Sequence, residues 1–247
     1  MTVFVLNTRP SHQAASLSNV INTLEGATAI ELPLLKIISM KKKYWQELCP
    51  PKKPEMLIFI SANAVENSID YLKNYWPIFP TIVAIGPATK RALERHGVIV
   101  NIMPDDFNSA SLIQHPLLHN IKHKTIILIK GCGGRQVLQD FIKHKEANLI
   151  ELNVYKRTCP PEIKNQIRKT WQNYEIDIIL IYSIESLKNI ISNAPSSIAI
   201  KIKNTPHFVI SERVKEYALK IGITNVILVK ESFEQKLNAY MRHRKIL

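Results

Sequence analysis

The sequence predicts an α/β protein built from two similar modules, each a five-stranded parallel sheet with flanking helices. Two observations support this fold class. Short β-branched runs alternate with helical patterns along the chain, which is typical of parallel sheets covered on both faces. One sequence unit also occurs twice, about 120 residues apart, so the 247 residues divide more naturally into two domains than into one.

The repeat is clearest where a strand runs into a helix. Three pairs of segments match in order: residues 57–65 with 178–186, 82–90 with 207–213, and 27–32 with 147–152. The last two segments both end in Ile-Glu-Leu. Because two similar α/β modules should face each other, we expect the binding site in the space between them.

Ten strands are expected, each a short run rich in β-branched residues. They are Val3–Asn7, Ala29–Leu32, Met56–Ile60, Ile82–Ile85, Val98–Ile102, Thr125–Ile129, Leu149–Val154, Asp177–Tyr182, His207–Ile210 and Asn225–Val229. Helical patterns lie between most of them, for example the apolar spacing of Leu17, Val20, Ile21 and Leu24. Ten strands make two five-stranded sheets.

The domain boundaries depend on two segments that follow the matched Ile-Glu-Leu runs. Residues from about 34 to 38 and from about 153 to 158 both read as extended linkers that leave equivalent points of the repeat. If these linkers run side by side, residues 38–153 form an inserted domain, and residues 1–36 with 158–247 form a discontinuous one. The repeat alone is equally compatible with two sequential domains.

Composition argues against a membrane-spanning or exported protein. No apolar run reaches the ~18 residues of a membrane span, and the first seven residues lack the basic start of a signal peptide. Cys49, Cys132 and Cys159 are scattered without metal or disulfide spacing, so we expect a cytoplasmic protein. The net charge of +13 favours anionic partners, but no nucleic-acid-binding motif accompanies it.

Two kinds of strand-to-helix turn are candidates for ligand contact. Gly131, Gly133 and Gly134 crowd into one loop, which either admits a ligand close to the backbone or is simply a tight turn. That loop lacks the Lys-Ser/Thr of a phosphate loop and the spacing of a dinucleotide fingerprint. Serines 61, 183 and 211 each begin a helix, where a serine acts as an N-cap or helps bind an anion.

Three histidines at four-residue spacing, at positions 115, 119 and 123, lack a metal motif, and no metal is expected.

Taken in order, the segments at these turns resemble the uroporphyrinogen-III synthase family. The matching segments are Thr8-Arg9-Pro10, Leu32-Pro33-Leu34 and residues 59–65, 84–89, 130–135, 154–157, 182–186 and 210–213, which together span nearly the whole chain. The resemblance implies two flavodoxin-like domains, the first discontinuous, joined by a two-stranded linker. It also implies a hydro-lyase that needs no cofactor and cyclises hydroxymethylbilane, which carries eight carboxylates, to uroporphyrinogen III. The terminal pyrrole ring is inverted and water is lost.

The resemblance also assigns roles to individual residues. It makes Tyr155 the proton donor to the departing hydroxyl, whereas the residue alone would read as a buried tyrosine with a satisfied hydroxyl. The expected substrate-binding positions are Arg9, Ser61, Ala62, Asn63, Gly86, Thr89, Gly131, Gly133, Gly134, Arg135, Ser183, Glu185, Ser186, Ser211 and Glu212. Of these, Arg9 and Arg135 either pair with substrate carboxylates or only form surface salt bridges. Many relatives differ at Ile60 and Cys132, so the side chains there should not be essential.

Other functions remain open at this point. A non-catalytic two-domain protein that binds small anions would show the same modules, although such proteins are usually exported. A basic nucleic-acid-binding module is supported by charge alone. For the enzyme, we expect no nucleic-acid or membrane partner and a monomer that suffices for activity, with transient handover from the preceding pathway enzyme as an option.

Overall fold

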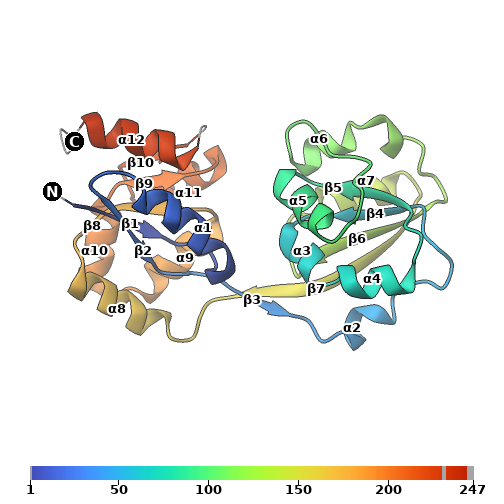
Figure 1. Cartoon of the computed structure of the whole chain (residues 1–247), viewed down its shortest axis with the longest axis horizontal. Helices are drawn as coiled ribbons and strands as arrows, with labels where there is room; N and C mark the ends of the chain where they lie inside the picture. Colours follow the sequence, from blue (N-terminus) through green and yellow to red (C-terminus); the bar gives the residue numbers. More distant parts are fainter. Residues whose placement is uncertain (1, 230–231, 244–247) are drawn as a thin grey trace. The chain divides into compact units, whose positions relative to one another are not determined.

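The computed structural model describes residues 2–229 and 232–243, and it divides into two compact units (Figure 1). Unit 1 comprises residues 1–36 and 158–247, so both chain ends belong to it, and unit 2 comprises residues 37–157. Each unit contains one five-stranded sheet, and nearly all strand pairs are parallel. The predicted fold class is confirmed.

Unit 1 has the strand order β10-β9-β8-β1-β2. Its strands are β1 (Val3–Asn7), β2 (Ala27–Glu31), β8 (Ile176–Ile181), β9 (His207–Val209) and β10 (Val226–Leu228). Its helices are α1 (Ser11–Asn22), α8 (Ile163–Asn173), α9 (Ile184–Asn193), α10 (Ser196–Asn204), α11 (Glu212–Lys220) and α12 (Phe233–His243). Numbered along the chain within the unit, this is the 2-1-3-4-5 order of flavodoxin-like folds.

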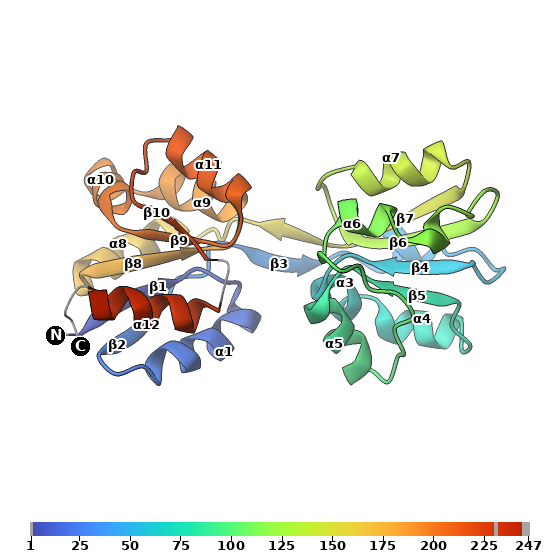
Figure 2. The same cartoon turned by 90° about the horizontal axis from the view of Figure 1, so that it is seen from above.

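Alternation along the strands of unit 1 produces two cores, one on each face of the sheet. Val5, Ile178 and Leu180 pack against α1 and α12, whereas Leu6, Ile179 and Ile181 pack against α8 to α11. Figure 2 shows the same two layers of helices on opposite sides of the sheet. Parallel strands buried on both faces need apolar residues at nearly every position, which explains the continuous Ile-Leu runs.

Unit 2 has the strand order β3-β7-β6-β4-β5. Its strands are β3 (Lys36–Ser39), β4 (Met56–Phe59), β5 (Thr81–Ala84), β6 (Thr125–Gly131) and β7 (Asn148–Thr158). Its helical segments are α2 (Lys43–Gln46), α3 (Ala62–Glu66), α4 (Ile69–Tyr75), α5 (Pro87–Arg95), α6 (Ser109–Ile113), the 3-10 turn η1 (Pro116–Leu118) and α7 (Val137–His144). Helices α2 to α5 cover one face, and α6, η1 and α7 cover the other. Figure 2 shows α3, α4 and α5 on one side of the sheet and α6 and α7 on the other.

Two of the expected elements are corrected in unit 2. The segment Val98–Ile102 is not a strand, because it makes only one bridge, between Ile102 and Val83. The Asn101 side chain accepts the Ile82 N–H at 2.7 Å, which takes the donor that a continuing ladder would need. Conversely, residues 36–39, expected as part of a linker, form β3 beside β7, and Met40 N–H extends the contact to the Val154 carbonyl at 3.0 Å.

The sequence repeat reappears in the order of the strands. In the sequence repeat, β8 and β9 correspond to β4 and β5. Likewise, β1 and β2 correspond to β6 and β7. Reading the sheets this way gives β10-β9-β8-β1-β2 in unit 1 and Ile102-β5-β4-β6-β7 in unit 2, with β3 added at the far edge. The Ile102 bridge therefore occupies the place that β10 fills in unit 1.

Candidate functional site

Each sheet contains a switch point, where adjacent strands send their connections to opposite faces. In unit 2, β4 leads to α3 on one face and β6 leads to α7 on the other. In unit 1, β8 leads to α9 and the neighbouring β1 leads to α1 on the opposite face. Ligands of open α/β sheets bind outside the carboxyl ends of the strands at such points. The predicted site residues follow these strands or their neighbours.

Tyr155 reaches the switch point of unit 2 because of an irregularity in β7. The register between β6 and β7 shifts after Lys130, so that Gly131 lies opposite Tyr155 and Val154 is skipped. Val154 and Tyr155 consequently pack in the same core, although consecutive strand residues normally point to opposite faces. Bulges of this kind often re-aim a side chain beside a functional site.

The re-aimed phenol meets the first turn of α3. Its Oη lies 3.1 Å from Ser61 Oγ, and only 5% of Tyr155 is exposed. Ser61 is the N-cap of α3, and its Oγ accepts the Ala64 N–H at 3.0 Å. The structure therefore joins two predicted site residues that are 94 positions apart in the chain.

Gly131 makes room for this tyrosine. A Cβ atom at position 131 would lie 2.5 Å from Cζ of Tyr155 and 2.7 Å from its Cε2. Such contacts are far closer than carbon atoms tolerate, so any larger residue would push the ring away. The glycine is needed here because of the close approach of the Tyr155 ring.

The rest of the glycine loop has a different requirement. Gly133 and Gly134 adopt φ angles of 73° and 97°, in the left-handed region that other residues avoid. Both are exposed, as is Arg135 after them, whereas the backbone of Cys132 is fixed by an N–H that donates to the Tyr155 carbonyl at 2.8 Å. The loop thus exposes its backbone beside the tyrosine.

An ion pair between a buried lysine and a partly exposed glutamate lies at the base of this loop and was not predicted from the sequence. Lys130 Nζ lies 2.9 Å from Glu151 Oε2 on β7, and the Gln139 amide donates to the same oxygen at 3.2 Å. The Lys130 side chain is only 6% exposed. Partial burial raises the pKa of Glu151, but the hydrogen bonds from Lys130 and Gln139 outweigh it and hold that pKa below its usual value. The cluster ties β6, β7 and α7 together below the glycine loop.

Strand β5 adds a second helix N-terminus to unit 2. Gly86 caps α5 with extended backbone, and Pro87 occupies the first helical position. Thr89 in the first turn is buried. Ala62 and Asn63 lie in the first turn of α3, which follows the adjacent strand β4. Helices α3 and α5 therefore both begin at the carboxyl ends of adjacent strands, and their N-terminal backbone N–H groups lie at the same edge of the sheet.

In unit 1, the predicted serines are N-caps. Ser183 Oγ accepts the Ser186 N–H at 3.0 Å at the start of α9, and Ser211 Oγ accepts the Val214 N–H at 3.4 Å at the start of α11. Ser186 is buried, with its Oγ 2.9 Å from that of Ser183. Glu185 and Glu212 lie in the first turns of these helices, where a carboxylate stabilises the helix dipole.

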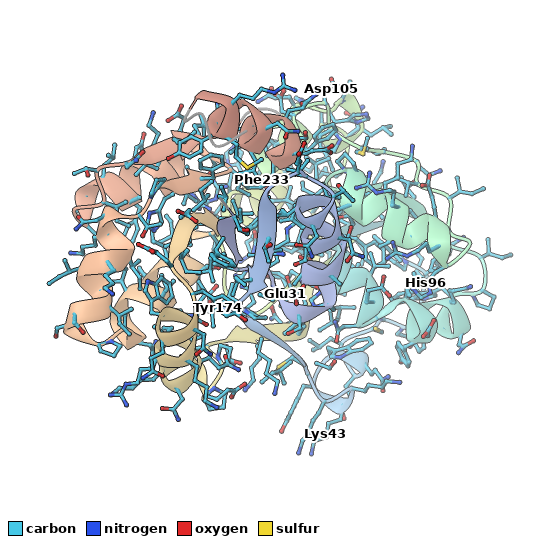
Figure 3. The ribbon with its side chains drawn as sticks, turned by 60° about the vertical axis from the view of Figure 1, so that its left-hand side comes forward. Glu31, Lys43, His96, Asp105, Tyr174 and Phe233 are labelled. Carbon is cyan, nitrogen blue, oxygen red and sulfur yellow. The ribbon has the colours of Figure 1, made fainter. Side chains whose placement is uncertain are left out.

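Arg9 follows β1 and lies over an aromatic ring. Its guanidinium carbon is 4.3 Å from the centroid of the Tyr182 ring, at the end of β8. The Tyr182 ring also contacts the ring of Phe233, with 5.1 Å between the two centroids. Phe233 is the first residue of α12 (Figure 3). Burial raises the pKa of Tyr182 despite the nearby Arg9. Arg9 is thus positioned by stacking at the switch point of unit 1.

Two of the three histidines at four-residue spacing have local structural contacts. The His115 ring accepts the Leu117 N–H at 3.3 Å, and His119 packs edge-on against Phe141. Within residues 2–229 and 232–243, no three His, Cys, Asp or Glu side chains are grouped closely enough to hold a metal ion. In the same part of the chain, no helix is long and apolar enough to cross a bilayer.

Comparison with known sequences gives one consistent family. A family model described as "Uroporphyrinogen-III synthase HemD" matches residues 20–237. The uroporphyrinogen-III synthase of Escherichia coli (strain K12) is 26% identical over 225 residues, which cover 88% of this chain and 91% of that protein. The enzyme of the same name from Proteus mirabilis is 24% identical over 196 residues, covering 76% of this chain and 98% of that protein.

Solved structures with the same architecture carry the same name. A mutant uroporphyrinogen III synthase from the extremely thermophilic bacterium Thermus thermophilus superimposes with a TM-score of 0.66 at 13% identity, covering 100% of both chains. Uroporphyrinogen-III synthetase from Helicobacter pylori 26695 gives a TM-score of 0.63 at 15% identity, covering 99% of this chain and 100% of that one. At such low identity, these likenesses establish the fold.

Proposed function

This chain belongs to the uroporphyrinogen-III synthase family, and we propose from that membership that its substrate is hydroxymethylbilane. It is a hydro-lyase of tetrapyrrole biosynthesis with uroporphyrinogen-III synthase activity. The observation that carries this conclusion is the family match along residues 20–237. The family match argues against the two alternatives that the sequence analysis left open, a non-catalytic anion-binding protein and a nucleic-acid-binding module.

The reaction sets two tasks for the protein. Loss of the substrate hydroxyl as water leaves an electrophilic azafulvene, whose methylene carbon is attacked by the substituted carbon of the last pyrrole ring. The resulting spiro intermediate fragments and closes again with that ring inverted. An unguided chain closes without inversion, so the enzyme must hold the substrate in one curl and help the hydroxyl to leave.

Tyr155 is the proposed proton donor to the leaving hydroxyl. A phenol is protonated at neutral pH and donates a hydrogen bond without bringing a charge into the site. Three observations support the assignment: the register shift that re-aims the ring, the space that Gly131 leaves for it, and the contact of its Oη with Ser61. All three concern the surroundings of the ring near the carboxyl ends of β4 and β6, where ligands of such sheets bind, and so they support the proposal.

Carboxylate binding is proposed for the turns around the two switch points. Exposed backbone of the glycine loop and the N-termini of α5, α9 and α11 suit anions, since free N–H groups and the helix dipole point outward there. Arg9 and Arg135 provide guanidinium groups, whose paired N–H donors match the two oxygens of a carboxylate. Glu185 and Glu212 are proposed as hydrogen-bond acceptors for pyrrole N–H groups or as helix-stabilising charges.

Three further properties belong to the same proposal. Cys49, Cys132 and Cys159 are all free thiols, which supports a reducing compartment such as the cytoplasm. One chain carries the switch points of both units, and we propose that a monomer suffices for activity. Handover of hydroxymethylbilane from the enzyme that makes it is proposed as a transient encounter, and the +13 charge would attract the anionic substrate itself.

A coupled assay tests the function directly. Hydroxymethylbilane is supplied to the purified protein, and the ratio of type III to type I uroporphyrinogen is measured by chromatography. We expect type III to predominate in proportion to enzyme concentration. A product ratio equal to the enzyme-free background, which is type I, would refute the activity.

A further inference from the structure

The hydrogen bond between Ser61 and Tyr155 has a direction that matters for proton donation. A serine hydroxyl has one hydrogen to donate and two lone pairs to accept with. One lone pair of Ser61 Oγ already accepts the Ala64 N–H at 3.0 Å, as part of the helix cap. The hydrogen of Ser61 is not used by the cap, and Tyr155 Oη, 3.1 Å away, is an acceptor within reach.

The two directions of this bond have opposite consequences for the phenol. If Tyr155 donates to Ser61, the phenolic hydrogen points into the protein and is withheld from a ligand. If Ser61 donates to Tyr155, the phenolic hydrogen is free to point toward a bound hydroxyl. The second arrangement also places a hydrogen bond on Oη that stabilises the negative charge developing there as the proton leaves.

We infer that Ser61 is a positioning residue that donates its hydrogen to Tyr155 Oη and so aims the phenolic O–H at the substrate. The inference rests on the proposed role of Tyr155 as proton donor. Ser61 is itself held by the Ala64 N–H, and the ring is held against Gly131, so both partners are fixed before the substrate arrives. Such preorganisation is what positioning requires.

Substitutions at Ser61 separate this role from simple helix capping. Ser61→Ala removes the donor, and we expect the single-turnover rate to fall roughly 3- to 10-fold, the range expected for one neutral hydrogen bond. Ser61→Thr keeps a hydroxyl that both caps and donates, and it should restore most of the rate. Because the effect passes through the phenol, the double variant Ser61→Ala/Tyr155→Phe should be no slower than Tyr155→Phe alone.

Asn108→Ala provides a matched capping control. Asn108 caps α6, a five-residue helix of the same unit like α3, by accepting the Ser111 N–H at 2.9 Å. Its loss should lower the melting temperature about as much as Ser61→Ala does, since each variant removes one N-cap. The single-turnover rate of Asn108→Ala should equal that of the wild type.

The outcomes distinguish the inference from the function on which it rests. A rate loss in Ser61→Ala that adds in full to that of Tyr155→Phe would show that Ser61 acts independently, and it would overturn the inference. An unchanged rate in Ser61→Ala beside a slow Tyr155→Phe would overturn it as well, while leaving the donor assignment intact. A wild-type rate in Tyr155→Phe would refute the donor role of the tyrosine itself.

Discussion

Substituting alanine for Gly131 places a methyl group against the Tyr155 ring. The added Cβ would lie 2.5 Å from Cζ, 2.7 Å from Cε2 and 3.0 Å from Cε1, with the ring face directly in its path. Ordinary carbon contacts are about 3.5 to 4.0 Å, so the ring must retreat by roughly 1 Å. The surrounding core is closely packed, with Tyr155 only 5% exposed, and it resists that movement.

Both the stability and the rate should respond to Gly131→Ala. Forcing an extra methyl group into a packed core costs about 1 to 3 kcal/mol of unfolding free energy. Moving a catalytic group by about 1 Å lowers the rate by up to ~10²-fold. Thermal unfolding measures the first effect. Single-turnover kinetics with saturating enzyme measures the second, because it isolates the chemical step from binding and product release.

Gly133→Ala is the comparison variant for this prediction. No atom lies within 4 Å of a Cβ at position 133, but its φ of 73° makes a side chain costly by about 1 to 2 kcal/mol. Gly133→Ala should therefore lose about as much stability as Gly131→Ala, but its chemical step should be much less affected. Any kinetic defect of Gly133→Ala should appear as weaker saturation with substrate. If Gly131→Ala turns over as fast as Gly133→Ala, the claim that Gly131 serves the placement of Tyr155 is wrong.

Three other predictions concern charge. Salt should slow association of the anionic substrate with this +13 protein, so the second-order rate at limiting substrate should fall with ionic strength; salt-independent turnover would exclude steering. Burial lowers the pKa of His207 to about 4 from 6.5, so the unfolded state binds the proton more readily. The unfolding free energy should therefore decline as pH falls from about 6.5 to 4, and His207→Gln should flatten that decline in denaturant titrations. Lys130→Met should lower the melting temperature clearly more than Lys122→Met. The Lys130 side chain, paired with Glu151, is 6% exposed, whereas the Lys122 side chain, paired with Glu146, is 62% exposed. Equal losses would contradict a structural role for the ion pair of Lys130.

The sheets were predictable because their signal is local and repeated. Continuous apolar runs identify strands buried on both faces, and the repeat indicates two sheets of the same kind. The N-cap role of Ser61, Ser183 and Ser211 was also foreseeable, since a serine between a strand and a helix commonly caps. The error at residues 98–102 has a specific cause: the β-branched run predicts a strand, but the Asn101 side chain takes a ladder donor.

The arrangement of the candidate site was less accessible to sequence reasoning. Strict alternation along β7 puts Val154 and Tyr155 on opposite faces, and no local pattern announces the register shift that brings them together. The contact of Tyr155 with Ser61 joins residues far apart in the chain, so it depends on the strand order. Lys130 reads as the solvated end of a strand because its partner, Glu151, is supplied by the next strand.

The most direct test of proton donation by Tyr155 is the single-turnover rate of Tyr155→Phe on hydroxymethylbilane. The substitution removes one oxygen and leaves the ring packed against Gly131, so substrate binding and folding should be preserved. We predict that the rate falls by about 10²-fold, the low end of the ~10²- to 10⁴-fold loss typical of acid catalysis. Uroporphyrinogen III should still be the main product. An unchanged rate under conditions where chemistry is limiting would mean that Tyr155 is structural and that the substrate hydroxyl leaves without its help.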